Sequence, residues 1–275
     1  MPARVPDTRA AEGATMPRPI QTFPLALSVL SLGALGLGAS TKLTPNTVSG
    51  RVVDERGKPV PGVRIIIEPA MFRGTITTTT NAQGRYQSIE LNPATNPYYV
   101  YAYKEVKYHD RRYCLRMAGD PEPYQEAFNA KAGAARNFVW RIRGESDSPS
   151  SSYGGDTWGG TLSFERIDTN DDLAVDRDAT VEVTLVPEGP LIDGSKGSVV
   201  KRTVQVSKGL GDVPVGAYKL SVALKNADGT KTPLLAGTSP REERLGNTTT
   251  VLFDGFDTCG HSGTFKQTPI WLAKP

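Results

Sequence analysis

The chain has 275 residues, enough for one or two domains with a sizeable core. Lys and Arg number 32 and Asp and Glu 29, so a formal charge of +3 gives no strong field for nucleic acid or an anionic membrane. With 28 Gly, 21 Pro and no helical pattern of useful length after residue 40, the composition favours an all-β protein with many turns.

Residues 1–39 have the layout of a secretory signal peptide. Arg18 precedes an apolar or small-residue run at 23–39, and the small residues that end this run suit a cleavage site. Met16 is an alternative start, because residues 16–39 alone have the usual length. The run is short for a membrane-spanning helix of about 20 residues, and no cysteine follows it to carry a lipid. We therefore expect a secreted, periplasmic or cell-envelope protein with no other membrane segment; an uncleaved anchor is the alternative.

Residues 48–91 alternate strand signals with turn signals at short spacing. Two turn clusters, at 55–62 and 81–84, are rich in Gly, Pro and Asn, which reverse the chain. Between and around them, four runs are rich in β-branched and aromatic residues. Two hairpins in fewer than about fifty residues are typical of a β-sandwich or barrel.

The same stretch resembles the carboxypeptidase regulatory-like family. The family's pattern is a strand, D-x-x-G-x-P-[LV]-x-G-[AV], a second strand and a T-x-T-x-x-x-G-x-[YF] hairpin. The matching residues are Gly50, Val52, Asp54, Gly57, Pro59, Val60, Gly62, Val63, Thr78, Thr80, Gly84 and Tyr86. The resemblance covers about residues 46–143 and implies a transthyretin-like (prealbumin-like) β-sandwich in a domain at 41–144. It implies little about function, because such modules are appended to many exported proteins. Another seven-stranded sandwich remains the alternative.

Three further strands are expected in this domain, at 98–103, 108–117 and 137–143. The loop between the last two, 118–136, is long enough to hold a short helix or a functional loop. In the last strand Phe138, Trp140 and Ile142 are expected in the core.

Alternation along residues 98–103 assigns two faces to that strand. Tyr98, Val100 and Ala102 form the better core set, which leaves Tyr99, Tyr101 and Tyr103 as a ladder on the opposite face. Flat aromatic faces with hydroxyl tips suit a sugar or a protein partner. The alternative is that the loop 118–136 or the second domain covers the ladder.

The next strand carries a cysteine among basic residues. Tyr113, Leu115 and Met117 share one face, and Arg112, Cys114 and Arg116 share the other, which is expected to point outward. The basic residues at 111, 112 and 116 are therefore interpreted as a solvated strand face rather than a binding patch.

Residues 145–158 are dominated by Ser and Gly and are interpreted as a linker. Trp158 either marks the entry to the next domain or makes a surface contact. Residues 159–275 again read as β-structure, so the fold class is all-β, with two immunoglobulin-like or transthyretin-like sandwich domains in tandem. Its expected strands are 161–167, 179–187, 198–206, 217–225, 231–236, 248–253 and 263–272.

No catalytic constellation is visible in the sequence. The two histidines, His109 and His261, lie in different domains, and there is no His-x-His pair like that of transthyretin-like catechol-cleaving enzymes. Cna B-type domains form a Lys–Asn isopeptide, but the first strand holds Arg51 and Asp54 instead of Lys, so Asn137 lacks its partner. We predict a protein that is not an enzyme.

One loop in the second domain resembles a calcium-binding loop. Asp168, Asn170, Asp172 and Asp176 match oxygen-ligand positions of such a loop. Leu173 stands where Gly is needed and Ala179 where the bidentate acid belongs, so a charged turn is favoured over a Ca²⁺ site. No other cofactor is expected.

Cys114 and Cys259 are the only cysteines, an even pair in a chain expected to reach an oxidising compartment. A bridge between them would join the two domains across the linker. The alternatives are two unrelated thiols or pairing with other chains.

Together these features predict an exported binding or structural protein of the cell envelope, with a glycan or a protein as its partner. The competing hypothesis is an enzyme, or an enzyme accessory protein, whose site the sequence does not reveal.

Overall fold

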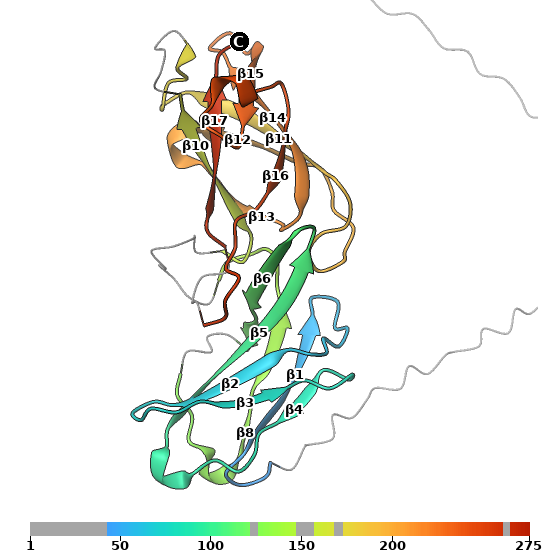
Figure 1. The fold of residues 1–275 in the computed structure, drawn as a ribbon, viewed down its shortest axis with the longest axis vertical. Helices are drawn as coiled ribbons and strands as arrows, with labels where there is room; N and C mark the ends of the chain where they lie inside the picture. Colours follow the sequence, from blue (N-terminus) through green and yellow to red (C-terminus); the bar gives the residue numbers. More distant parts are fainter. Residues whose placement is uncertain (1–42, 122–125, 147–156, 168–172, 261–264) are drawn as a thin grey trace, which may run out of the picture. The chain divides into compact units, whose positions relative to one another are not determined.

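The computed structural model describes residues 43–121, 126–146, 157–167, 173–260 and 265–275. In these residues the chain is all-β, with short 3-10 helices as its helical segments (Figure 1). All of the described strands belong to one compact unit, Lys42–Pro275. They form two β-sandwiches, one from the strands before residue 141 and one from the strands after residue 159, which confirms the predicted fold class.

The first sandwich consists of two sheets. One sheet has the order β4-β1-β9-β7, with β8 beside β1, and the other has the order β3-β2-β5-β6. The strands of the first sheet are β1 (Val48–Asp54), β4 (Arg85–Gln87), β7 (Ala118–Asp120), β8 (Ala134–Ala135) and β9 (Asn137–Trp140). The strands of the second are β2 (Arg64–Pro69), β3 (Ile76–Thr79), β5 (Tyr98–Tyr108) and β6 (Arg111–Arg116), and the 3-10 helices are η1 (Pro93–Thr95) and η2 (Ala130–Ala132).

The family motif forms the turn after β1. The Asp54 carboxylate accepts hydrogen bonds from the backbone N–H groups of Arg56 and Lys58, both at 2.9 Å, and from the Arg56 guanidinium. Burial alone would raise the pKa of Asp54, but these hydrogen bonds lower it below its ordinary value. Gly57 supplies the positive φ that closes the turn. At Gly50, a Cβ atom would overlap the Arg136 carbonyl oxygen, so the family's glycine permits a close backbone approach.

The core of the first sandwich follows the predicted alternation. Tyr98, Val100 and Ala102 of β5 are buried, as expected, and so are Ile65 and Ile67 of β2. In and after β9, Phe138 and Ile142 are buried as predicted, whereas Trp140 is half-buried. Burying large apolar side chains contributes about 1.5–3 kcal/mol each, which makes this inner face the main source of stability.

The second sandwich has two sheets that share one strand. The connected order is β12-β11-β14-β15-β17-β10-β13, with β16 also paired to β14. Residues 231–234 of β15 pair with β14, and residues 235–237 pair with β17, so β15 passes from one sheet to the other. The strands are β10 (Gly160–Arg166), β11 (Thr180–Pro187), β12 (Val200–Gln205), β13 (Leu210–Val213), β14 (Ala217–Lys225), β15 (Lys231–Gly237), β16 (Thr249–Leu252) and β17 (Gln267–Ala273), with 3-10 helices η4 (Val206–Lys208) and η5 (Glu242–Arg244).

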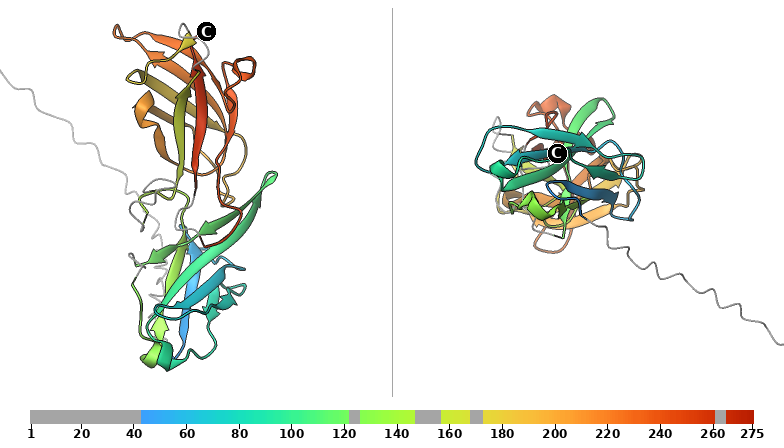
Figure 2. Two further views of the ribbon diagram at one scale, coloured as in Figure 1. Left: turned by 60° about the vertical axis from the view of Figure 1, so that its left-hand side comes forward. Right: turned by 90° about the horizontal axis from the view of Figure 1, so that it is seen from below.

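Three details differ from the sequence prediction. Strand β5 continues to Tyr108 instead of ending at 103, which makes the β5–β6 hairpin long (Figure 2). The segment expected to be one loop, 118–136, contributes strands β7 and β8 to the first sheet, and it also holds the short helix η2, as the sequence allowed. Strand β13 was not predicted, because its short run Leu-Gly-Asp-Val contains a single β-branched residue. It pairs with β10 through Gly160 and Leu162.

Candidate functional site

The tyrosine ladder lies on the outer face of the β3-β2-β5-β6 sheet, and its members are not equally exposed. Tyr99 and Tyr101 are half-buried, and their rings stack with centroids 6.2 Å apart and planes at 22°. Tyr103 is only 5% exposed, so it is not accessible to a partner, and the alternative that other segments cover the ladder holds for this one member. Burial raises the pKa of Tyr103 to about 12 and also raises that of Tyr101, so both hydroxyls stay neutral at physiological pH.

Near the buried Tyr103, in a region called here the covered end, the same face also carries Arg116 and Cys114. Both were expected to point outward, and both are buried instead. Arg116 stands opposite Tyr103 in the β5–β6 register, and its guanidinium carbon lies 4.6 Å from the centroid of the Trp158 ring. Trp158 is fully buried, which rules out the open surface contact considered for it. The prediction failed because alternation defines the face of a strand but not which distant segment packs on that face.

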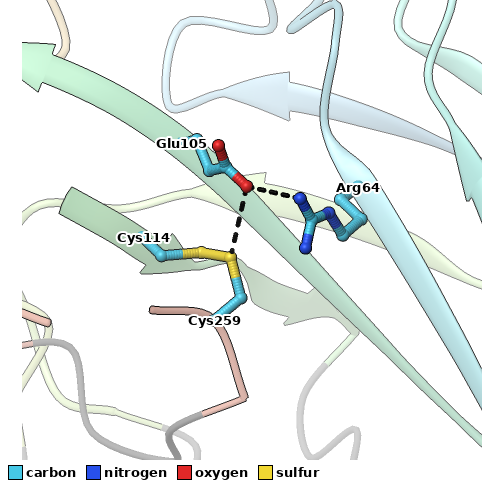
Figure 3. Close-up of a disulfide and its surroundings, with 4 residues drawn as sticks. All are labelled: Arg64, Glu105, Cys114 and Cys259. Carbon is cyan, nitrogen blue, oxygen red and sulfur yellow. Dashed lines mark hydrogen bonds and ion pairs between the residues drawn. A yellow bond between two sulfur atoms is a disulfide. The ribbon is translucent and has the colours of Figure 1, made fainter. Parts of the chain in front are cut away.

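A disulfide joins Cys114 of β6 to Cys259 of the segment between β16 and β17 (Figure 3). The two Cα atoms are 5.1 Å apart, within the usual range for such a bridge. The Cys114 backbone N–H donates to the Phe256 carbonyl oxygen at 2.7 Å, so the backbones are also hydrogen-bonded at this point. The predicted bridge between the first and second sandwiches is therefore confirmed.

Two tyrosine hydroxyls of the β5–β6 hairpin reach backbone groups of the second sandwich. The Tyr108 hydroxyl donates to the Pro190 carbonyl oxygen at 2.7 Å and accepts from the Ala217 N–H at 2.8 Å. The Tyr113 hydroxyl donates to the Phe253 carbonyl oxygen at 3.0 Å. Burial raises the pKa of both phenols, so they remain donors at neutral pH. A Cβ atom at Gly255 would overlap the Tyr113 ring, so glycine is required there for this contact.

Charged side chains surround these contacts at the surface. Arg111 pairs with Asp254 at 2.6 Å, and Arg56 lies 3.9 Å from the Asp193 carboxylate. The Asp212 carboxylate accepts from the Gly144 N–H at 2.6 Å. Exposed ion pairs contribute only about 0–1 kcal/mol each. The disulfide, the two phenols and Trp158 are therefore expected to dominate the stability of the junction, meaning the set of contacts between the two sandwiches.

A cavity of about 600 Å³ lies beside the disulfide. Its charged lining comes from β2, β5 and β6 on the outer sheet face and from the segment that carries Cys259. Glu105 lies between the two parts: its Oε1 pairs with the Arg64 guanidinium at 2.5 Å and is 3.8 Å from the Cys259 sulfur (Figure 3). A smaller cavity of about 300 Å³ lies on another side of the junction and includes Glu55, Arg143 and Lys196. The large cavity thus lies beside the tyrosine face, next to the disulfide.

The predicted calcium loop falls mostly outside the described residues. Asp168, Asn170 and Asp172 lie there, whereas Asp176 is exposed and its carboxylate accepts from the Asp178 N–H at 2.9 Å. Within the described ranges, no group of three or more His, Cys, Asp or Glu side chains is placed to hold a metal ion. Calcium binding by this loop remains a prediction.

The remaining residues singled out from the sequence have structural contacts. His109 packs edge-on against Tyr108, with ring centroids 4.6 Å apart, and His261 lies outside the described residues. The Asn137 side chain accepts a hydrogen bond from the Arg51 N–H at 3.0 Å, which ties β9 to β1. Sequence reasoning missed the roles of Tyr108 and Trp158. The available signal was the position of each residue: Tyr108 ends the run of aromatic residues that begins at Tyr98, and Trp158 ends the Ser- and Gly-rich linker.

The family model of the carboxypeptidase regulatory-like domain matches residues 47–114, which confirms the predicted resemblance. The match extends from the start of β1 into β6, so it includes Cys114 and the whole tyrosine face. No curated protein matches the chain significantly.

Solved structures give only distant likenesses. A Streptococcal ancillary pilin is 12% identical, with 84% of this chain and 63% of that chain covered and a TM-score of 0.26. The shaft pilin spaA from Lactobacillus rhamnosus GG is 11% identical over 85% of this chain and 98% of that chain, with a TM-score of 0.21. The pilus adhesin SpaC from the same organism is 9% identical over 85% and 29%, with a TM-score of 0.23. TM-scores and sequence identities this low support no conclusion about fold or function.

The predicted signal segment, 1–39, lies outside the described residues. In the part of the chain that is described, no helix is long and apolar enough to cross a membrane.

Proposed function

We propose that this chain is an exported, non-enzymatic protein of the cell envelope, in which two β-sandwiches act as one locked unit and present a binding face. The observation that carries the proposal is the Cys114–Cys259 disulfide between the sandwiches. Stable disulfides of this kind form and persist in oxidising compartments such as the periplasm or the cell surface. The apolar run at 23–39 supplies the matching export signal.

The proposed binding face is the open end of the tyrosine ladder. Tyr99 and Tyr101 keep part of their ring surface accessible and lie on a rigid sheet, with β2 on one side of β5 and β6 on the other. Rigid, amphipathic aromatic rings offer contact area at low entropic cost, which suits a glycan or a protein partner.

The location is tested by expressing the full chain in a bacterial host and fractionating the cells. We expect the mature protein in the envelope or the medium, with an N-terminus between residues 17 and 42 and no titratable thiol before reduction. A cytosolic protein with two free thiols would overturn the exported, disulfide-locked protein proposed here.

The binding role is tested by applying the exported protein to a glycan array and to a pulldown from envelope extracts. Tyr99→Ala with Tyr101→Ala should weaken whatever is captured, whereas the control Tyr86→Phe, on another sheet, should not. If hydrolysis or transfer of a captured ligand is observed instead, the non-enzymatic assignment is wrong.

A further inference from the structure

The cavity beside the disulfide carries an unbalanced set of charges. Lys107 of β5 and Arg112 of β6 stand directly opposite each other in the antiparallel register, and both are exposed. Like charges at such positions are destabilising unless a counter-charge is present. Neither side chain has an ion pair or hydrogen bond with any other described residue. The pair is therefore available to an anion from outside the protein.

The other charged groups of the cavity do not remove this imbalance. Arg64 and Glu105 pair with each other, which leaves Asp257 as the remaining acid of the lining against two cations. Asp257 is as exposed as the two cations, so the three cations and two acids of the lining leave a formal charge of +1. The lining therefore retains a net positive charge in a partly enclosed space, where electrostatic attraction to an anion is stronger than on an open surface.

An apolar strip leads from the cavity to the open tyrosines. Ile66 of β2 lines the cavity and stands opposite Tyr101 in the β2–β5 register, and Tyr101 in turn stacks on Tyr99. Tyr101 and Lys107 are six positions apart on β5, or about 20 Å at the usual rise per residue. The ligand must therefore be a chain of several units, with an anionic group at one end and flat, partly apolar faces along its length.

We propose that this cavity and strip bind an acidic oligosaccharide, with a carboxylate held by Lys107 and Arg112 and sugar rings packed against Ile66, Tyr101 and Tyr99. The inference deepens the proposed function and rests on it. An acidic peptide would satisfy the cations but offers no regular series of flat faces for the tyrosine strip, so the oligosaccharide is the better match. The disulfide joins the sheet wall of the cavity to the segment that carries Asp257 and Thr258.

The test is isothermal titration of the full exported protein with three probes of equal length: hexagalacturonate, maltohexaose and hexaglutamate peptide. Hexagalacturonate should bind at least about tenfold more tightly than the other two, and its affinity should fall as salt rises. A sulfated oligosaccharide hexamer serves as a fourth probe, and binding as tight as that of hexagalacturonate would overturn the recognition of a carboxylate. Equal binding of maltohexaose would overturn the role of the cations, and tighter binding of hexaglutamate would show a protein-type partner.

Two variants and a control assign the interaction to the cavity. Lys107→Gln with Arg112→Gln should weaken hexagalacturonate binding at least about tenfold and reduce its salt dependence, and Tyr101→Ala should weaken binding without changing that dependence. Lys219→Gln, an exposed cation on β14 outside the cavity lining, should leave the affinity unchanged. An unaffected double variant would overturn the inference. Export of the protein and its binding to a glycan array would still support the proposed function in that case. Failure of the acidic-oligosaccharide inference can therefore be told apart from failure of the proposed function.

Discussion

The two ends of the outer face of the β3-β2-β5-β6 sheet differ in what lies on them. At one end Tyr99 and Tyr101 are half-buried and stack on each other. Towards the other end Tyr103, Cys114 and Arg116 are buried, before Lys107 and Arg112 are again exposed near the turn of the β5–β6 hairpin. The two ends share one alternating strand pattern, yet Trp158 and the segment around Cys259 pack on only one of them. The period of a strand therefore sets which side chains share a face, and chain segments distant in sequence decide which of those side chains remain open.

The covered end is also where the two sandwiches meet. Its side chains have a disulfide and a cation–aromatic contact, and on the opposite face of β6 Tyr113 donates a hydrogen bond to the Phe253 carbonyl oxygen. The Tyr99 and Tyr101 hydroxyls, in contrast, have no hydrogen bond to any described residue. We therefore expect substitutions at the covered end to alter stability and substitutions at the open end to alter binding.

The largest effect is expected from removing the disulfide. Cys114→Ser with Cys259→Ser should lower the free energy of unfolding by about 5 kcal/mol, because the bridge closes a long loop in the unfolded chain. Urea denaturation of oxidised wild type and of the double variant measures the difference. Reduced wild type is the control and should match the variant. A loss below about 1 kcal/mol would mean that the bridge does not constrain the unfolded chain in this way.

Trp158→Ala should cost about 3–5 kcal/mol, because it removes a fully buried ring and leaves a cavity beside Arg116. Tyr99→Ala, the matched substitution at the open end, should cost less than about 1 kcal/mol. Both values come from the same urea denaturation series. Similar costs for the two variants would contradict the division into a covered and an open end.

Tyr108→Phe should cost about 1–3 kcal/mol, because it leaves the Pro190 carbonyl and the Ala217 N–H without their partner. Tyr101→Phe should change stability by less than about 0.5 kcal/mol, since it removes a hydroxyl with no such partner. Thermal unfolding of the two variants against wild type checks both values. An unchanged melting temperature for Tyr108→Phe would show that this contact adds nothing to the junction.

The smallest effect concerns acid. The folded state lowers the pKa of Asp54, so the stability from its hydrogen bonds is present above the ordinary carboxyl pKa and is lost as pH falls through the lowered value. Asp54→Asn should therefore cost about 1 kcal/mol at pH 7 and progressively less towards pH 3. Denaturation at a series of pH values measures this. A cost that does not change between pH 7 and pH 3 would contradict this account.

Much of the fold could be predicted from the sequence. The turn residues and the family motif located β1 to β4, and alternation assigned Tyr98, Val100 and Ala102 to the core. The disulfide was predictable because only two cysteines exist. The burial of Arg116 was not, since Trp158, which packs on it, is more than forty residues further along the chain. The cavity was not predictable either, because its charges come from three strands and a segment of the second sandwich.

The central claim is that the two sandwiches move as one locked unit, and ¹⁵N relaxation of the oxidised protein tests it most directly. Rotational diffusion is fitted separately to the amides of β1–β9 and of β10–β17. We predict that one diffusion tensor describes both sets. Two sets with different correlation times while the Cys114–Cys259 bridge is intact would contradict the claim.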